Sequence, residues 1–142
     1  MSSNFKALLA GVKAEIREVS VQEVNDKLNG NNEFTLIDIR EKDEWDEGHL
    51  SGALFLPRGF LEVKVEGIVT DKERPVILYC AGGVRSALAA KSLAELGYKN
   101  VVSMAGGYGE WKNNGYDFVV PESVGKDSDG ALQPPSQDPG SR

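Results

Sequence analysis

Residues 75–86 read PVILYCAGGVRS, and this stretch decides the fold class that the sequence predicts. Its first five residues form a short apolar run of the kind found in strands that are covered on both faces. The run leads directly into Cys80 and a pair of glycines, after which Ala89, Leu93 and Leu96 recur at helical spacing. The pattern predicts a buried strand, a tight turn that begins at Cys80, and a helix.

The turn that begins at Cys80 is suited to hold a negative charge. At the carboxyl edge of a parallel sheet, such a turn points several backbone N–H groups and the positive end of a helix dipole into one concavity. Gly82 and Gly83 permit the tight turn. The N–H groups would stabilise a thiolate there, which makes Cys80 a candidate nucleophile that needs no separate base. From these residues alone, a buried and inert cysteine is an equally open interpretation.

Strand and helix signals alternate along the rest of the chain. Ser20 and Glu23 have the spacing of a capping box at the start of a helix, and the acid-rich residues 41–47 predict a short helix that ends at Gly48. Residues 60–69 carry mixed signals and are left unassigned. Three further strands and a last short helix are predicted over residues 34–39, 53–56 and 101–104 and around Trp111. This alternation indicates an α/β domain with a mainly parallel sheet.

Three ordered motifs resemble those of the rhodanese superfamily. The loop from Cys80 to Arg85 resembles the six-residue form of the family's active-site loop. Residues 38–53, which contain DIRE, EW and GHLSGA, resemble its N-terminal signature, and the pair Gly106 and Gly107 with Trp111 resembles its C-terminal one. The resemblance covers about residues 19–118. Ser51 departs from it, because the family often has proline there, and this difference affects a turn rather than the chemistry.

The resemblance implies a three-layer α/β domain with a mainly parallel central sheet of about five strands and helices on both faces. It also implies a sulfurtransferase. In that reaction the Cys80 thiolate attacks the outer sulfur of a donor such as thiosulfate or a persulfide, and the resulting Cys80 persulfide passes its sulfur to a thiol or to cyanide. The residues expected to hold the donor are Ala81, Gly82, Gly83, Val84, Arg85 and Arg58.

Both arginines have an alternative role. Arg85 is suited to a bidentate contact with an anionic donor, and equally to pairing with an acidic residue that braces the loop. Arg58 is open to a role as a solvated surface residue. Asp38 and Arg40 are predicted to brace the end of a central strand rather than to catalyse. His49 is predicted to be a turn residue, because persulfide chemistry needs no imidazole.

Two rival functions use the same features. A phosphatase or arsenate reductase also places a cysteine and an arginine around an amide-lined cradle, but rhodanese-fold phosphatases use a loop one residue longer, which suits a tetrahedral oxyanion better than a single sulfur atom. The second rival is a binding or regulatory module in which the fold persists without turnover. The intact Cys80 argues against that module without excluding it.

Composition limits the remaining classes. The chain has 142 residues, a formal charge of -6, one cysteine and one histidine, so neither a nucleic-acid surface nor a Cys/His metal site is expected, and no cofactor is implied. Residues 1–18 are predicted to be an N-terminal extension with a short amphipathic helix over residues 5–12, residues 19–120 the rhodanese-like domain, and residues 121–142 a disordered tail. The lack of a signal-peptide core or membrane span favours the cytoplasm.

Overall fold

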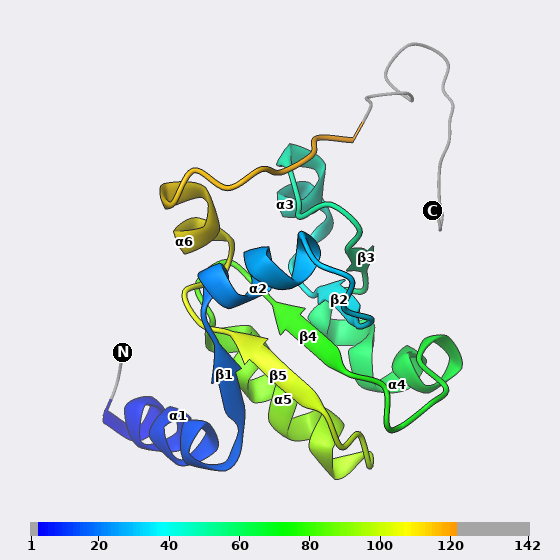
Figure 1. Cartoon of the computed structure of the whole chain (residues 1–142). Coiled ribbons are helices and arrows are strands. Elements are labelled where there is room, and N and C mark those ends of the chain that lie inside the picture. The colour runs from blue at the N-terminus through cyan, green and yellow to red at the C-terminus, as the bar shows by residue number, and fades with distance from the viewer. Residues whose placement is uncertain (1–2, 122–142) are drawn as a thin grey trace, which may run out of the picture.

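The structure is a computed structural model that describes residues 3–121, within which a five-stranded sheet is surrounded by six helices (Figure 1). The strands are β1 (Arg17–Val19), β2 (Thr35–Asp38), β3 (Leu54–Phe55), β4 (Val76–Tyr79) and β5 (Val101–Met104). The helices are α1 (Ser3–Glu15), α2 (Val21–Leu28), α3 (Lys42–Glu47), α4 (Arg58–Ile68), α5 (Val84–Glu95) and α6 (Gly107–Asn113). Apart from Pro121, the predicted tail lies outside the described residues.

All neighbouring strands of the sheet are parallel, in the order β1-β5-β4-β2-β3. The predicted sheet of about five strands is therefore confirmed. Strand β4 is central, and each of its four residues is buried, which explains the unbroken apolar run from Val76 to Tyr79. Because the strands are parallel, the loops after β2, β3, β4 and β5 all leave from the same edge of the sheet.

Strand β1 was not predicted from the sequence. It pairs with β5, with Arg17 opposite Val102 and Val19 opposite Met104. It has three residues, two of them charged and exposed at the edge of the sheet, so it shows no apolar run. The boundary suggested between the extension and the domain passes through this strand.

Two clusters of apolar side chains fill the space on the two faces of the sheet. On one face α4 and α5 contribute Leu61, Val65 and Leu93 to the core. On the other face α2 and α6 contribute Val24 and Trp111. The predicted layer of helices on each face is confirmed.

Helix α1, which contains the helix predicted over residues 5–12, packs against α5 rather than against the sheet. Leu9 and Val12 are buried there with Ala87 of α5, and Val84, at the start of α5, lies at the edge of this cluster. An ion pair of 3.0 Å from Lys91 to Glu15 joins the other ends of the two helices. The N-terminal helix thus contacts the helix that follows Cys80.

The unassigned residues 60–69 form most of α4. The intrinsic helix preference of α4 is weak, because the helix contains Gly59, Gly67 and the β-branched Val63. Burial of Leu61 and Val65 under the sheet compensates, since both side chains are completely inaccessible to solvent. Tertiary packing therefore decides this element.

Candidate active site

Cys80 follows the last residue of β4, and its side chain is 1% exposed. The Sγ atom accepts hydrogen bonds from the backbone N–H of Gly83 at 3.2 Å and of Ser86 at 3.3 Å. Gly83 adopts a φ of 95° immediately before α5, a conformation that favours glycine and turns the chain back over the sulfur. The loop and the first turn of α5 thus direct N–H donors at the sulfur, an arrangement suited to a negative charge there.

A pair of buried hydroxyl groups continues this environment. Ser86 Oγ lies 3.6 Å from Cys80 Sγ and 2.7 Å from Ser103 Oγ, and both serines are completely buried. Ser103 belongs to β5, so the hydroxyl pair connects the start of α5 to the neighbouring strand. Sequence reasoning missed Ser103, because one serine within an apolar strand carries no signal of its own.

We expect Ser86→Ala to lower the rate of the sulfur uptake predicted for Cys80 by about tenfold, because it removes the hydroxyl that lies 3.6 Å from the sulfur and would donate to a thiolate there. Ser103→Ala is the matched variant: it breaks the same serine pair but leaves the hydroxyl beside the sulfur. Uptake is measured by intact-protein mass after mixing with a sulfur donor. Equal losses in both variants would contradict a direct role of the Ser86 hydroxyl.

The first residues of α6, which follow the turn after β5, bind the backbone of the Cys80 loop. The N–H of Tyr108 donates to the carbonyl of Cys80 at 2.8 Å, and the N–H of Gly109 donates to that of Ala81 at 3.0 Å. Gly107 has a φ of 62°, and a Cβ atom there would lie 2.5 Å from the Ala81 carbonyl oxygen and 2.6 Å from that of Cys80. This glycine is what lets the two loops approach each other.

Gly107→Ala is therefore expected to destabilise the fold by about 1–3 kcal/mol and to displace the Cys80 loop. Gly109→Ala is the control, because its Cβ would meet the Ala81 oxygen at an ordinary 3.4 Å inside a helix. Urea unfolding and the rate of sulfur uptake are compared for the two variants. A Gly107→Ala protein that retains the wild-type value of both would show that the close approach is not required.

Arg85, the last residue of the loop, pairs with Glu44 of α3 through two contacts of 3.2 Å. This hydrogen bonding raises the pKa of Arg85, and the charges of Cys80 and Glu41 also raise it. Partial burial opposes them by lowering that pKa. Partial burial works to raise the pKa of Glu44, but the hydrogen bonds from Arg85 and from the N–H of Glu41, together with the charges of Arg85 and Arg40, outweigh it and the pKa is lowered. Arg85 thus has the bracing contact considered for it from the sequence.

Arg58, the first residue of α4, also has a carboxylate partner. Its Nη1 donates to the two carboxylate oxygens of Glu62 at 2.6 and 2.8 Å, and its Nη2 lies 3.5 Å from Ser92 Oγ of α5. The side chain is about 29% exposed and lies between two helices rather than free in solvent. Its assignment to donor binding stays a prediction.

Behind the loop, Asp38 and Arg40 form a buried pair at the end of β2. Arg40 donates to both carboxylate oxygens of Asp38 at 2.8–3.1 Å and to the carbonyl of Gly48 at 2.6 Å. Its guanidinium lies against the rings of Tyr79, which precedes Cys80, and of Tyr108. The bracing role predicted for this pair matches these contacts.

His49 makes contacts that fit a turn residue. Its ring stacks on Trp45 with 3.4 Å between the centroids, its Nδ1 lies 2.9 Å from the Leu50 carbonyl, and its backbone pairs with Val119. Burial lowers the pKa of His49, which favours the neutral ring.

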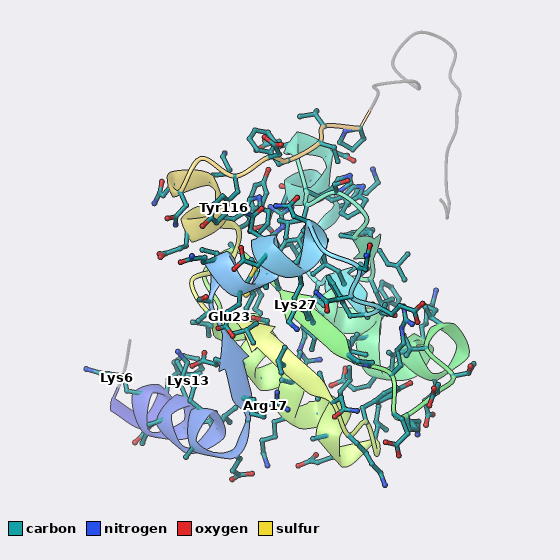
Figure 2. The ribbon with its side chains drawn as sticks, in the orientation of Figure 1. Lys6, Lys13, Arg17, Glu23, Lys27 and Tyr116 are labelled. Carbon is teal, nitrogen blue, oxygen red and sulfur yellow. The ribbon has the colours of Figure 1, made fainter. Side chains whose placement is uncertain are left out.

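Within residues 3–121, no group of three or more His, Cys, Asp or Glu side chains is placed to bind a metal ion, and no helix is long and apolar enough to cross a bilayer. A hollow of about 420 Å³ lies between α2 and the segment after α6, and Asn25, Asn29 and Tyr116 are among the residues that line it. Tyr116 is labelled in Figure 2. None of its lining residues belongs to the Cys80 loop. We therefore assign the candidate site to Cys80 and not to this hollow.

The fold and the site together define a class: α/β proteins that present a cysteine in an amide-lined loop at the carboxyl edge of a parallel sheet. The model of the rhodanese-like domain family matches residues 20–114, and the chain belongs to this family.

Several relatives of the chain are named as sulfurtransferases. The chain is 38% identical over 80 residues to the thiosulfate sulfurtransferase GlpE of Coxiella burnetii, covering 56% of this chain and 73% of that protein. It is 31% identical, with a TM-score of 0.72, to the polysulfide-sulfur transferase homodimer of Wolinella succinogenes, covering 85% of this chain and 90% of that one. A Rhodopseudomonas palustris protein of unknown function, described as a possible tyrosine phosphatase, is 29% identical with a TM-score of 0.74, covering 80% and 92%. At the level of the family, the two sulfurtransferases support sulfur transfer as the activity.

The structure brings most of the predicted site residues into one loop. Ala81, Gly82 and Gly83 follow Cys80 and lead into α5, of which Val84 and Arg85 are the first two residues. Gly82 is exposed and Gly83 is buried. The sequence analysis missed Glu44 as the partner of Arg85, since 41 positions separate the two residues and only the fold joins them.

Proposed function

We propose that this protein is a sulfurtransferase that carries a sulfane sulfur on Cys80, moving it from thiosulfate or a persulfide donor to a thiol or to cyanide. The observation that carries the proposal is the pair of N–H donors that Gly83 and Ser86 direct at Cys80 Sγ. The thiolate attacks the outer sulfur of the donor and expels sulfite or a thiolate. The transferred sulfur remains on Cys80, and N–H groups of the loop stabilise its charge.

The donor-binding roles of Ala81, Gly82, Gly83, Val84, Arg85 and Arg58 are part of this proposal. Exposed Gly82 and half-buried Ala81 form the outer part of the loop through which a donor reaches the sulfur. A cytoplasmic location, where a lone cysteine is kept reduced, fits the same chemistry and stays a prediction.

Intact-protein mass spectrometry tests the proposal directly. The protein is mixed with thiosulfate, and separately with a thiol persulfide, and then treated with cyanide. We expect a gain of one sulfur mass that disappears when cyanide is added. No gain from either donor would contradict the proposal.

A phosphatase is the second candidate, because one solved structure similar to this chain is described as a possible tyrosine phosphatase. Two features favour sulfur transfer. The loop from Cys80 to Arg85 has six residues. Arg85 is paired with Glu44, and this ion pair would have to break before the guanidinium bound a phosphate. Hydrolysis of an aryl phosphate that requires Cys80, in a protein that takes up no sulfur, would favour the phosphatase.

A further inference from the structure

The two arginines that are predicted to bind an anionic donor, Arg85 and Arg58, are each paired with a carboxylate. Arg85 contacts both oxygens of Glu44 at 3.2 Å, and Arg58 contacts both oxygens of Glu62 at 2.6 and 2.8 Å. The side chains of Arg85 and Glu44 are 36% and 31% exposed, so this pair lies at the margin of the protein surface.

The electrostatic surroundings of Arg85 contain more negative than positive charge. Its charge is offset by Glu44, and Glu41 and Cys80 also act on it as negative neighbours. Lys42, the first residue of α3, is itself paired with Asp46 at 2.6 Å. The basic residues Lys6, Lys13, Arg17 and Lys27 lie on α1, β1 and α2 (Figure 2). A donor with two negative charges therefore approaches a loop whose own cation is already neutralised.

We infer that Glu44 is a specificity-determining residue, which makes the Cys80 site select sulfur donors with at most one negative charge and disfavour the thiosulfate dianion. This inference rests on the proposed sulfur transfer and narrows its donor to the class of thiol persulfides. Glu44 does so by neutralising Arg85, and Glu62 does the same for Arg58. Under this inference the donor contacts proposed for Arg85 and Arg58 are weakened by their carboxylate partners, and the N–H groups that bind the sulfur itself contribute most of the donor binding.

The transfer from a persulfide balances without any co-reactant. The Cys80 thiolate attacks the outer sulfur of R–S–SH, a Cys80 S–S bond forms, and the donor's S–S bond breaks. The thiolate R–S⁻ leaves with the electron pair of the broken bond, and the proton stays on the transferred sulfur. The sulfane sulfur keeps its oxidation state, so neither an oxidant nor a reductant is needed.

Two small donors that differ by one charge test the inference. Thiosulfate is a dianion and methanethiosulfonate a monoanion, and each donates its outer sulfur to a thiolate, with sulfite or a sulfinate as the leaving group. The second-order rate constant for sulfur uptake by Cys80 is measured for both donors in the wild type and in Glu44→Gln. The glutamine still accepts the N–H of Glu41 that caps α3, so the helix end is retained.

Glu44→Gln is expected to raise the rate constant for thiosulfate about tenfold relative to that for methanethiosulfonate, as Coulomb's law gives for one charge near a partly exposed site. Dividing the donor ratio of the variant by that of the wild type cancels the different intrinsic reactivities of the two donors. Glu62→Gln is expected to act in the same direction through Arg58. Glu66→Gln removes one charge from the distant pair with Lys72 and is expected to leave the ratio unchanged.

Salt dependence in the wild type provides a test without any variant. Raising the ionic strength from about 0.01 M to about 0.15 M shortens the screening length from about 30 Å to about 8 Å. Thiosulfate uptake is expected to rise, because repulsion is screened. A fall with salt, or an unchanged donor ratio in Glu44→Gln, would overturn this inference alone. A Cys80 that takes up sulfur from neither donor would contradict the proposed function, and the inference with it.

Discussion

Cys80→Ser is expected to lower the rate of sulfur uptake by at least about a thousandfold. A serine hydroxyl stays protonated near neutral pH, whereas a thiol yields a thiolate readily, and the thiolate is the reactive form. Cys80 is the sole cysteine of the chain, so no second thiol can take over the transfer. The measurement is the gain of one sulfur mass on the intact protein after addition of a donor.

The serine variant is also a fair test of the fold, because its oxygen keeps an acceptor for the N–H groups of Gly83 and Ser86. Its free energy of unfolding in urea is measured beside the wild type to separate loss of chemistry from loss of structure. A Cys80→Ser protein that acquires sulfur at the wild-type rate would mean that the sulfur is bound elsewhere. The role proposed for Cys80 would then be wrong.

The central part of the fold follows from local sequence, because the chemistry there is local. The run from Val76 to Tyr79 is apolar because β4 is covered on both faces, and Gly83 stands where the chain must turn with a positive φ. The capping box of Ser20 and Glu23 is present at the start of α2 as the spacing predicts. Such features depend on residues a few positions apart.

Features that depend on distant residues were not predictable in this way. Strand β1 exists because β5 offers it a free edge, and its own three residues show no strand pattern. Ser103 matters through its contact with Ser86, and Glu44 through its contact with Arg85. In each case the fold makes the contact, and one sequence gives no sign of which partner the fold will supply.

The buried pair of Asp38 and Arg40 leads to the largest expected effect on stability. Asp38 is completely buried and Arg40 is 3% exposed, so neither charge is solvated when its partner is lost. Burial by itself lowers the pKa of Arg40, but the hydrogen bonds and charge of Asp38 outweigh it and raise that pKa. Asp38→Asn leaves a buried cation, and Arg40→Met leaves a buried carboxylate. Each is expected to lower the free energy of unfolding by about 3–5 kcal/mol.

The double variant separates an uncompensated charge from a simple loss of packing. Asp38→Asn with Arg40→Met removes both charges, and it is expected to cost less than the two single changes added together. Lys42→Met, which breaks the exposed pair with Asp46, serves as the surface control and is expected to change stability by less than about 1 kcal/mol. Strictly additive losses in the double variant would show that the two charges are not coupled.

The same buried pair is expected to affect the site, because its contacts reach the two residues that support Cys80. The Arg40 guanidinium lies 4.2 Å from the centroid of the Tyr108 ring, and the N–H of Tyr108 donates to the Cys80 carbonyl. Tyr79, on which Arg40 also lies, directly precedes Cys80. Single variants that remain folded should therefore take up sulfur more slowly than Lys42→Met. Without the buried pair, Tyr108 is held less firmly, and so is the carbonyl of Cys80 to which its N–H donates.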